Sequence, residues 1–577
     1  MSVKQKSLTV PRAVLYIAIG IAIVNIFILF LGAWKIGVTW DEDAMANFLK
    51  GYLNNGWFTD SEFVINGIPD RNYVFFLYAY GPIANLIAHG FGVILGVEQI
   101  GVISLSPEAF AGRHIGTAFM AVIGVLAIAA TSRSIFGSWR WGVLSGTFLL
   151  VTPLWIGHGM FNIKDIPVAS AFSLAVLGSV LMVRSTYLSS RLIRFFAVSS
   201  IALGALLGAG TRPAIGFPIA LTVLATPILL AIWSKWGWNN SNQDPRVWTA
   251  ALRRLIDAFI GLFVAYVLLV VIYPKAFINP LLLGYEAIVI SGSFPFDESV
   301  LTAGTWMQQP PDWQYLPLWF AAQLPLLILI ASGVGTVVLV ASIVSRRFAK
   351  SHQLSGFVPA FIPIALQAFA LPLVAVLTGA AIYNGTRQFL FVLPAFALLS
   401  TLGVRYLISV SIKKPTIVIG IWVLVALGMV LPTLAQVQLF PYSYAYFNAI
   451  TLTTSGVDGK WPTDYWRASS NELIRNLPVN GLEGCAYEQG LWLRSAQCQD
   501  QPMFRPFASE RGTAAGSREP NENSYWVLRE NQGQLRLPAG CDLVESGTKS
   551  LMWQEITIWQ LMECEISVPY SEFTHGS

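Results

Sequence analysis

The sequence predicts an all-α polytopic membrane protein with about 11 transmembrane helices, followed by a small extracytoplasmic C-terminal domain of mixed or β-rich structure. Of the 577 residues, 55% are hydrophobic and only 12% are charged, whereas soluble proteins carry about 25% charged residues. The mean hydropathy is +0.59. All four cysteines lie in the last hundred residues, where the chain becomes polar. These observations exclude a large soluble core for most of the chain.

The first apolar stretch, residues 12–34, is long enough to cross a bilayer, which needs about 20 apolar residues. It is too long for the apolar part of a signal peptide and lacks a small-residue cleavage site, so we expect it to remain as the first helix. Similar stretches follow along the chain. The predicted spans are 12–34, 113–131, 141–157, 167–183, 195–211, 213–233, 257–277, 316–344, 357–380, 389–410 and 415–437.

The charges in the loops between these spans predict a topology. Lys and Arg gather in the N-terminal tail and in alternate loops, which agrees with the positive-inside rule only if residues 73–97 do not cross. That apolar stretch contains Pro82 and four glycines, and we predict a juxtamembrane helix at the outer face. The N-terminus then lies on the cytoplasmic side of the plasma membrane and the C-terminus on the outer side. The net charge of +5 says little about partners, because the cations concentrate in short loops where the topology requires them. We expect no nucleic-acid partner.

The chain is predicted to divide into two domains. Residues 1–438 form the transmembrane catalytic domain, whose outer loop 35–112 carries juxtamembrane helices. Residues 439–577 form the extracytoplasmic domain and open with an aromatic segment, 440–447, suited to the membrane interface. We find no internal repeat in either part.

The four cysteines of the C-terminal domain predict two disulfides. An even number confined to a polar domain is typical of an oxidising compartment, which also places this domain outside. Three pairings are open, and we favour the local one, Cys485–Cys498 with Cys541–Cys564. Four free thiols in a cytosolic tail are the alternative.

Unusual polar residues fall in the predicted outer turns, where charge is costly and has few structural uses. Arg212 and Arg387 run against the positive-inside bias, which makes them more informative than the other arginines. Asp43 suits the cap of the following helix, and Asp165 has the alternative role of a cap ahead of Pro167. The candidate site residues are Asp41, Glu42, His158, Lys164, Asp165, Arg212 and Arg387, with Arg113 at the start of the second span.

Separated acids and several cations at an outer membrane surface suit sugar transfer from a lipid phosphate. Asp41 or Glu42 would deprotonate the acceptor hydroxyl as general base, an effect of ~10²–10⁴-fold. Cations, or a divalent metal held by Asp41 and Asp165, would stabilise the leaving phosphate. Apart from such a metal we expect no cofactor. The candidate phosphate or substrate contacts are Lys164, Arg212, Arg387, His158 and Arg113.

The order of several motifs resembles the GT-C superfamily of membrane glycosyltransferases. It is most similar to bacterial members of glycosyltransferase family 39, relatives of protein O-mannosyltransferases and of the lipid A aminoarabinose transferase. The resemblance covers roughly residues 12–470. Its motifs are Asp41-Glu42, Tyr80-Gly81-Pro82, Ala111-Gly112-Arg113-His114, Asn-x-Lys-Asp-x-Pro at 162–167, Arg387-Gln388-Phe389-Leu390-Phe391, Phe440-Pro441-Tyr442 and Asp464-Tyr465-Trp466.

The resemblance implies a GT-C-like fold and an inverting transferase that uses a polyprenyl-phosphate sugar donor at the outer face of the bilayer. It implies that Asp41 is the general base, that Asp165 supports a metal or the donor head group, and that Glu42 contacts substrate or metal. The acceptor would be a glycan, a lipid or a protein. The chain departs from the family in residues 470–577, which match no carbohydrate-binding domain that we recognise.

Three other functions remain as alternatives. A flippase or transporter of lipid-linked sugar would require ionisable residues within spans or two matching halves, and the sequence has few of the former and no repeat. A non-catalytic membrane subunit with an exported binding domain would leave Asp41, Asp165 and Arg387 unexplained. Within enzymes, the alternative is a ligase that uses a polyprenyl diphosphate donor.

Overall fold

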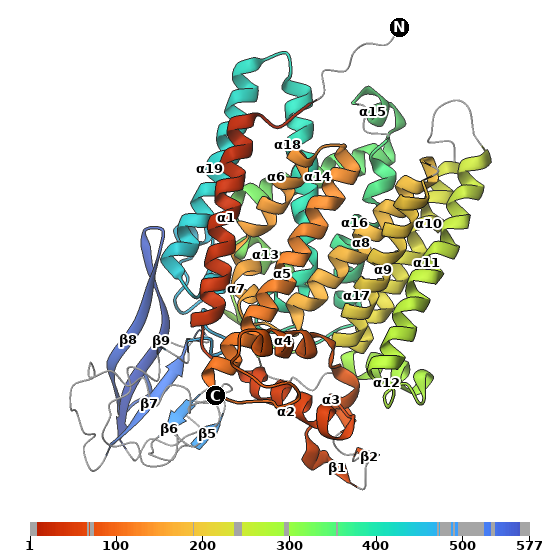
Figure 1. Cartoon of the computed structure of the whole chain (residues 1–577). Coiled ribbons are helices and arrows are strands. Elements are labelled where there is room, and N and C mark those ends of the chain that lie inside the picture. The colour runs from red at the N-terminus through yellow and green to blue at the C-terminus, as the bar shows by residue number, and fades with distance from the viewer. Residues whose placement is uncertain are drawn as a thin grey trace.

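The computed structural model describes residues 8–65, 68–69, 74–188, 190–235, 245–292, 299–352, 356–469, 472, 486–488, 491–493, 524–531, 533 and 537–565. Within them the chain forms a tall helical bundle with a sheet beside its lower end (Figure 1). Ten helices of this described part are long and apolar enough to cross a membrane. They are Arg12–Lys35 (α1), Pro107–Phe136 (α5), Asp165–Tyr187 (α8), Arg191–Thr211 (α9), Pro213–Ser234, Trp248–Ile272, Leu326–Val344 (α14), Val358–Leu377, Arg387–Ser411 and Pro415–Leu439 (α19).

The all-α, multi-span fold predicted from the sequence is confirmed, and several of these stretches are composite. Short 3-10 turns begin three of them, and one of these three, Val358–Leu377, also contains a π turn, so that each apolar run is longer than any one α-helix within it. Their parts are η3 Pro213–Ile215, α10 Gly216–Lys235, α11 Pro245–Ile272, η4 Val358–Phe361, α16 Ile362–Ala365, η5 Leu366–Ala370, α17 Leu371–Leu377, η6 Arg387–Val392 and α18 Leu393–Ser411.

The predicted span at 141–157 is not one helix but two, α6 (Trp139–Leu150) and α7 (Pro153–Gly159). Thr152 between them is extended, with φ −87° and ψ 105°. The break follows from Pro153, because proline lacks an N–H and disfavours helical backbone in the residue before it. The apolar pattern alone could not reveal this interruption.

Pro325 divides the predicted span at 316–344 in the same way. Its N-terminal part is the separate helix α13 (Tyr315–Gln323), and only α14 beyond the proline has the length of a crossing. Other helical pieces are short. Among them are η1 Ser61–Phe63, α15 Arg346–Ser351, η7 Ser443–Ala445 and α20 Ala449–Thr454.

Residues 73–97 do not cross the bundle, as the loop charges predicted. They form α3 (Val74–Ala79) and α4 (Ile83–Ile94), which lie across the lower end of the bundle with α2 (Trp40–Asn55) and α12 (Pro280–Gly292) (Figure 1). Gly81 joins α3 to α4 and donates its N–H to Thr211 O at 2.9 Å. A Cβ at Gly81 would collide with the backbone of Gly210, so glycine permits this close approach.

Helix α8 is the most enclosed of the long helices, because 83% of its most apolar stretch is buried. Phe172 on α8 stacks on Phe391 of η6, with ring centroids 4.9 Å apart. Aromatic pairs of this kind add to the free energy of burial. The packing holds the start of α18 against α8, and both helices begin at the same end of the bundle.

The described part of the C-terminal domain is a five-stranded antiparallel sheet of order β5-β6-β7-β9-β8. The expected mixed or β-rich unit is therefore a β-sheet. Two small hairpins, β1–β2 and β3–β4, lie in loops of the helical domain. The strands are β1 Val64–Ile65, β2 Ile68–Pro69, β3 Val300–Thr302, β4 Thr305–Met307, β5 Ala486–Glu488, β6 Leu491–Leu493, β7 Ser524–Glu530, β8 Cys541–Leu551 and β9 Gln554–Glu565.

One of the two predicted disulfides, Cys541–Cys564, falls on described strands of the sheet. Cys541 is disulfide-bonded, and Cys564 stands directly opposite it in the β8–β9 register. Directly opposed residues of an antiparallel pair lie close enough for such a bond. The other predicted pair, Cys485 and Cys498, lies outside the described residues.

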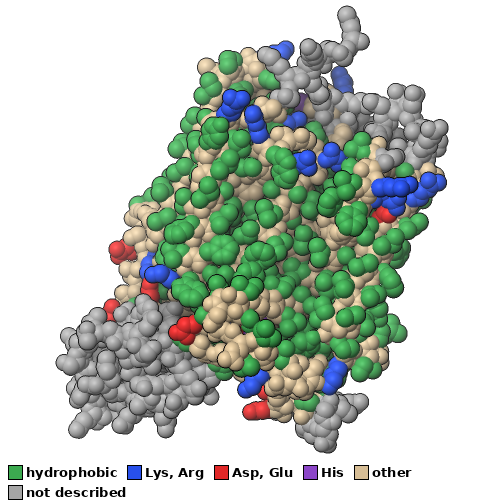
Figure 2. Space-filling model, in the orientation of Figure 1, with side chains coloured by type: hydrophobic (Ala, Val, Ile, Leu, Met, Phe, Trp, Pro, Cys, Tyr) green, Lys and Arg blue, Asp and Glu red, His purple; other side chains and the backbone are tan. Residues whose placement is uncertain are grey.

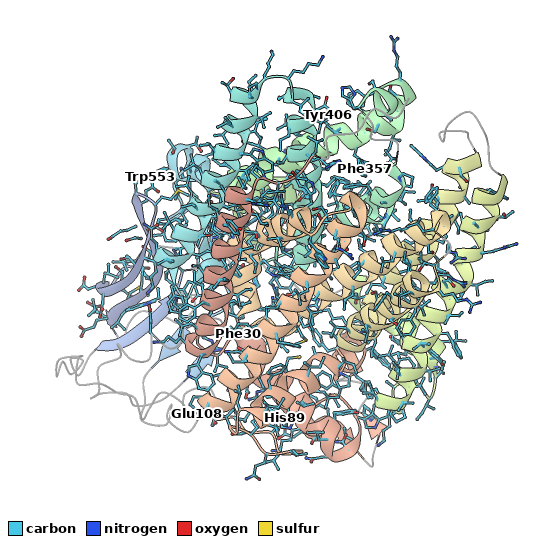
Figure 3. All side chains as sticks on the ribbon, turned by 45° about the horizontal axis from the view of Figure 1, so that its top comes forward. Phe30, His89, Glu108, Phe357, Tyr406 and Trp553 are labelled. Atoms are coloured by element: carbon cyan, nitrogen blue, oxygen red, sulfur yellow. The ribbon has the colours of Figure 1, made fainter. Side chains whose placement is uncertain are left out.

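Figure 2 shows a broad apolar belt over the long helices, with Lys and Arg gathered towards the upper end. Large apolar side chains on this belt face outwards, as in a protein surrounded by lipid; examples are Phe27, Leu126 and Val271. Figure 3 marks the two ends of the bundle: His89 and Glu108 lie at the lower end, and Phe357 and Tyr406 lie towards the opposite end.

Candidate active site

Five charged side chains that are far apart in the sequence meet at the lower end of the bundle. Lys164 Nζ lies 2.5 Å from Asp41 Oδ2, and Arg212 Nη2 lies 3.0 Å from Asp165 Oδ1. Arg387 Nη1 lies between the two acids, 3.9 Å from Asp41 and 3.8 Å from Asp165. We call these five residues the charged cluster. All five belong to the predicted site, and the fold brings them together.

Asp41 is placed by the first turn of α2. The N-cap is Thr39, and Glu42 completes a capping box in which its Oε2 accepts from the Thr39 N–H at 2.8 Å. Glu42 Oε1 also lies 2.5 Å from Nε2 of the buried His114. The predicted cap at Asp43 is therefore wrong, because Asp43 lies inside the first turn and Thr39 supplies the cap. Capping leaves Asp41 free to face the cations.

Lys164 and Asp165 are placed by Asn162. The side-chain oxygen of Asn162 accepts from the backbone N–H of Lys164 at 3.2 Å and of Asp165 at 2.8 Å. Its amide nitrogen donates to Asp165 Oδ2 at 3.0 Å. Asn162, and not the Asp165 carboxylate, thus satisfies the open N–H groups at the start of α8. The Asp165 carboxylate is left to hold the two arginines.

The two arginines enter from separate turns. Arg212 follows the last residue of α9 in extended conformation, with φ −137°. Arg387 follows Asn384 and Gly385, both left-handed at φ 56° and 67°, which are the residue types that adopt this conformation most readily. The predicted tight turn at 384–386 is confirmed. Nε and Nη1 of the buried Arg387 have no hydrogen-bond partner in the described part of the chain.

Aromatic rings enclose the cations of the charged cluster. The Arg387 guanidinium carbon lies 4.4 Å from the Trp466 ring centroid and 4.7 Å from that of Tyr383. Lys164 Nζ lies 5.0 Å from the Tyr80 ring and 5.4 Å from the Trp466 ring. Such cation–π contacts stabilise a charge that has little water around it.

Three of these neighbours were not among the predicted site residues. Tyr80 and Trp466 did stand in motifs that carried the family resemblance, which was the signal available for them. Nothing in the sequence distinguished Tyr383, because many aromatic residues of this chain lie near the membrane surface. Only the fold shows which rings cover the cations.

Exposure differs sharply within the charged cluster. The side chain of Asp41 is 35% exposed, whereas Lys164 and Asp165 are 5% exposed and Arg387 is 4% exposed. Arg212 is intermediate at 24%. Asp41 is therefore the carboxylate of the cluster that an incoming molecule can reach.

The cations control the ionisation of Asp41. Loss of surrounding water by itself raises the pKa of Asp41, but the charges of Lys164 and Arg387 outweigh it and hold this pKa below the ordinary 3.8. Desolvation lowers the pKa of Lys164 and of Arg212, but nearby acids, Asp41 for the former and Asp165 for the latter, raise both above their ordinary values. Counted as ion pairs, three cations against two carboxylates give the cluster a net charge of +1.

Three predicted site residues stand apart from these ion pairs. His158 is completely buried and bonds through Nε2 to the Tyr465 hydroxyl at 3.0 Å, behind Asn162. Arg113 donates to the Ser104 carbonyl at 2.7 Å and pairs with Glu98 at 3.8 Å. Glu42 bonds to Thr39 and His114, as described above.

The charged cluster does not suit a divalent metal held by Asp41 and Asp165. Each of these carboxylates is already paired with two cations, and the cluster carries a positive charge. Three or more His, Cys, Asp or Glu side chains do not converge anywhere in the described residues. A cation would have to displace a lysine and an arginine, which Coulomb repulsion opposes.

No protein-family model and no curated protein matches the sequence. Among solved structures, the chain is similar to ArnT from Cupriavidus metallidurans bound to undecaprenyl phosphate, with a TM-score of 0.42 and 13% identity over 94% of this chain and 97% of that one. The apo form of that protein gives 0.41 and 13% over 95% and 98%. The Archaeoglobus fulgidus oligosaccharyltransferase in complex with Zn and sulfate gives a TM-score of 0.42 at 13% identity. That match covers 88% of this chain and 59% of the oligosaccharyltransferase chain.

Proposed function

We propose that this protein is an integral-membrane glycosyltransferase that moves a sugar from a polyprenyl-phosphate donor to an acceptor at the outer face of the plasma membrane. The observation that supports this most strongly is the charged cluster, which combines buried cations with one reachable carboxylate at an end of an apolar bundle. A lipid phosphate brings its anion to this depth because its tail stays in the bilayer. Arginine and lysine are the residues that bind phosphate oxygens.

The net charge of the cluster favours a monophosphate donor. A sugar on a polyprenyl monophosphate is a phosphodiester with a single negative charge, which matches the +1 of the cluster. A diphosphate donor would bring more negative charge than the cluster can balance, and buried charge without a partner is costly. This comparison favours the monophosphate over the ligase alternative with a diphosphate.

Donor binding would also prepare Asp41 to act as base. The phosphate competes for Lys164 and Arg387, which now hold the pKa of Asp41 below its ordinary value. As these cations turn to the phosphate, the Asp41 carboxylate becomes a better proton acceptor. The buried Nε and Nη1 of Arg387 have no hydrogen-bond partner in the described structure and supply donors for the phosphate oxygens.

The transfer is a single displacement. The acceptor hydroxyl gives its proton to Asp41, and its oxygen forms a bond to the anomeric carbon of the sugar. The bond between that carbon and the phosphate oxygen breaks, and the polyprenyl phosphate leaves with the electron pair. Lys164, Arg212 and Arg387 stabilise the charge that grows on it, while Asp165 holds the two arginines in place. Attack on the face opposite the phosphate inverts the anomeric carbon.

An outward-facing site has independent support. Cys541 forms a disulfide, as is usual in oxidising compartments, and its sheet lies at the same end as the charged cluster (Figure 1). The basic residues lie towards the other end (Figure 2), which the positive-inside rule assigns to the cytoplasm. The acceptor would then be a glycan, a lipid or a protein of the cell envelope.

The test is transfer by purified protein in detergent from radiolabelled polyprenyl-monophosphate hexose or pentose to an envelope fraction from cells lacking the protein. Asp41→Asn keeps the shape of the side chain and removes its basicity, so we expect kcat to fall by ~10²-fold or more, with donor binding largely retained. The matched control is Asp312→Asn, in an exposed loop, which should leave transfer unchanged.

Two outcomes would contradict the proposal. Near-normal transfer by folded Asp41→Asn would remove the catalytic assignment. Movement of labelled lipid across liposomes by the wild-type protein, without transfer, would instead support the flippase alternative.

A further inference from the structure

The loop at residues 463–469, here called the Trp466 loop, touches both halves of the charged cluster. Trp466 covers the guanidinium of Arg387 at 4.4 Å and lies 5.4 Å from Lys164 Nζ. Two residues later, the carbonyl of Ala468 accepts from the N–H of Gly37 at 3.1 Å. Gly37 lies just before the capped start of α2, which carries Asp41. The position of this loop therefore affects the phosphate side and the base side together.

The Trp466 loop does not have a conformation that would persist by itself. Arg467 is left-handed, with φ 56°, which is uncommon for residues other than glycine and needs support from its surroundings. Inside the loop, the completely buried Asp464 accepts from the N–H groups of Ala468 at 3.2 Å and Ser469 at 3.1 Å. It also accepts from the Tyr444 hydroxyl at 2.6 Å. Asp464 thus sets the shape of the turn.

The C-terminal sheet holds the beginning of this loop from outside. The carbonyl of Asn531, at the end of β7, accepts from the N–H of Thr463 at 2.9 Å and of Asp464 at 3.1 Å. The carbonyl of Thr557 on β9 accepts from Thr463 Oγ1 at 2.5 Å and from Asn531 Nδ2 at 2.8 Å. Asn531 is 1% exposed. These bonds join two strands of the sheet to the Trp466 loop.

A second link ties β9 to the chain just before this loop. Thr557 donates its N–H and hydroxyl to Asp458, at 3.1 Å and 2.8 Å. Gln554 Nε2 donates to the carbonyl of Leu452 at 2.9 Å. The sheet is therefore fastened along the whole segment that leads into the site, and it is not a freely attached domain.

From this geometry we infer that the C-terminal sheet is a positioning clamp for the donor site. Its strands fix the Trp466 loop through Thr463 and Asn531, so that Trp466 covers Arg387 and the start of α2 stays in register. This role rests on the proposed function, and it assigns a task to a domain that the sequence left open. None of the clamp residues touches the reacting atoms; they act through Trp466.

The test weakens the clamp without touching the cluster. Thr463→Val keeps the shape of the side chain and deletes its hydroxyl bond to the Thr557 carbonyl. Asn531→Ala deletes the bond from the Asn531 amide to the same carbonyl, which supports Asn531 from β9. The backbone bonds to the Asn531 carbonyl remain in both variants. We expect each variant to raise the donor KM about three- to tenfold, the usual effect of one lost hydrogen bond, with the acceptor KM unchanged. Thr548→Val is the matched control, because Thr548 is exposed and stands opposite Thr557 in the same sheet.

Amide hydrogen exchange supplies a readout that does not depend on activity. In the clamp variants, exchange should quicken in peptides covering 463–469 and remain as in wild type in α5 and α8. If Asn531→Ala does not fold, Thr463→Val still decides the matter. Unchanged exchange at 463–469 together with an unchanged donor KM would overturn the clamp.

The two proposals can fail separately. If the wild-type protein transfers no sugar from any polyprenyl phosphate, the proposed function is wrong, and the exchange result still reports on the clamp alone. If transfer occurs and the clamp variants raise donor and acceptor KM equally, or lower only the amount of folded protein, the sheet has a structural role and no particular link to the donor.

Discussion

At the scale of single residues, Asp41 and Glu42 are adjacent carboxylates with opposite surroundings. The Glu42 carboxylate accepts hydrogen bonds from the backbone N–H and the hydroxyl of Thr39, and it also forms a hydrogen bond with Nε2 of His114. Asp41 faces Lys164 and Arg387 and stays 35% exposed. Adjacent side chains on a helix point in different directions, so the acidic group predicted as one feature separates into a structural acid and a reachable one.

The dependence of the rate on pH should reveal whether the donor phosphate draws Lys164 and Arg387 away from Asp41 and so raises the pKa of Asp41. A base must be ionised, so activity is lost as pH falls through its pKa. In the free enzyme the pKa of Asp41 is lowered, and the acidic limb of kcat/KM should lie below the ordinary 3.8. In the donor complex the cations also serve the phosphate, so the acidic limb of kcat should lie at higher pH. The reverse order of the two limbs would contradict this mechanism.

Arg387 should not tolerate replacement by lysine. Arg387→Lys keeps the charge but loses the planar group that lies over Trp466 and Tyr383 and the fork that grips phosphate. We expect kcat/KM for the donor to fall by ~10–10²-fold, chiefly through KM, on the basis of charged hydrogen bonds. Arg133→Lys is the control, because Arg133 also lies over a ring, that of Trp139, but at the other end of α5. Equal effects of the two substitutions would remove the phosphate assignment.

At the scale of elements, helix starts and breaks place the site. The capping box starts α2 one residue before Asp41, Asn162 starts α8 at Asp165, and the turn at 384–385 delivers Arg387. The turn at 384–386 was predicted from the sequence. The helix caps were not, because Asp43 was expected to cap α2, where Thr39 is the cap, and Asn162 was not predicted to hold the start of α8. The division of α6 from α7 was missed, because an apolar run does not distinguish one helix from two.

Substitution of Glu42 separates a structural from a catalytic role. Glu42→Gln keeps the size of the side chain but weakens its bonds to Thr39 and His114. We expect a loss of about 0.5–2 kcal/mol of stability, the range for a helix cap, seen as a lower unfolding temperature in detergent. The kcat of the folded protein should stay within about tenfold of wild type, unlike that of Asp41→Asn. A fall in kcat as large as that of Asp41→Asn, with stability unchanged, would make Glu42 the base.

At the scale of the whole molecule, the site and the disulfide-bonded sheet lie at one end of an apolar bundle and the basic residues towards the other (Figures 1 and 2). An impermeant maleimide should therefore label Ile100→Cys, in the exposed loop between α4 and α5, in intact cells. It should label Arg347→Cys, in the short helix α15 that follows α14, only after permeabilisation. Labelling of Arg347→Cys in intact cells would reverse the topology.

The sequence by itself determined the membrane class, the long apolar helices and the non-crossing segment at 73–97, because hydropathy and loop charge act locally along the chain. It also named all five members of the charged cluster, since charge at a membrane surface stands out against an apolar background. Only the tertiary structure decided which charges pair, that Asp41 is the reachable acid, and that Trp466 covers Arg387. These are contacts between residues that lie far apart in the sequence, and they depend on how helix ends meet, a property that no local pattern contains.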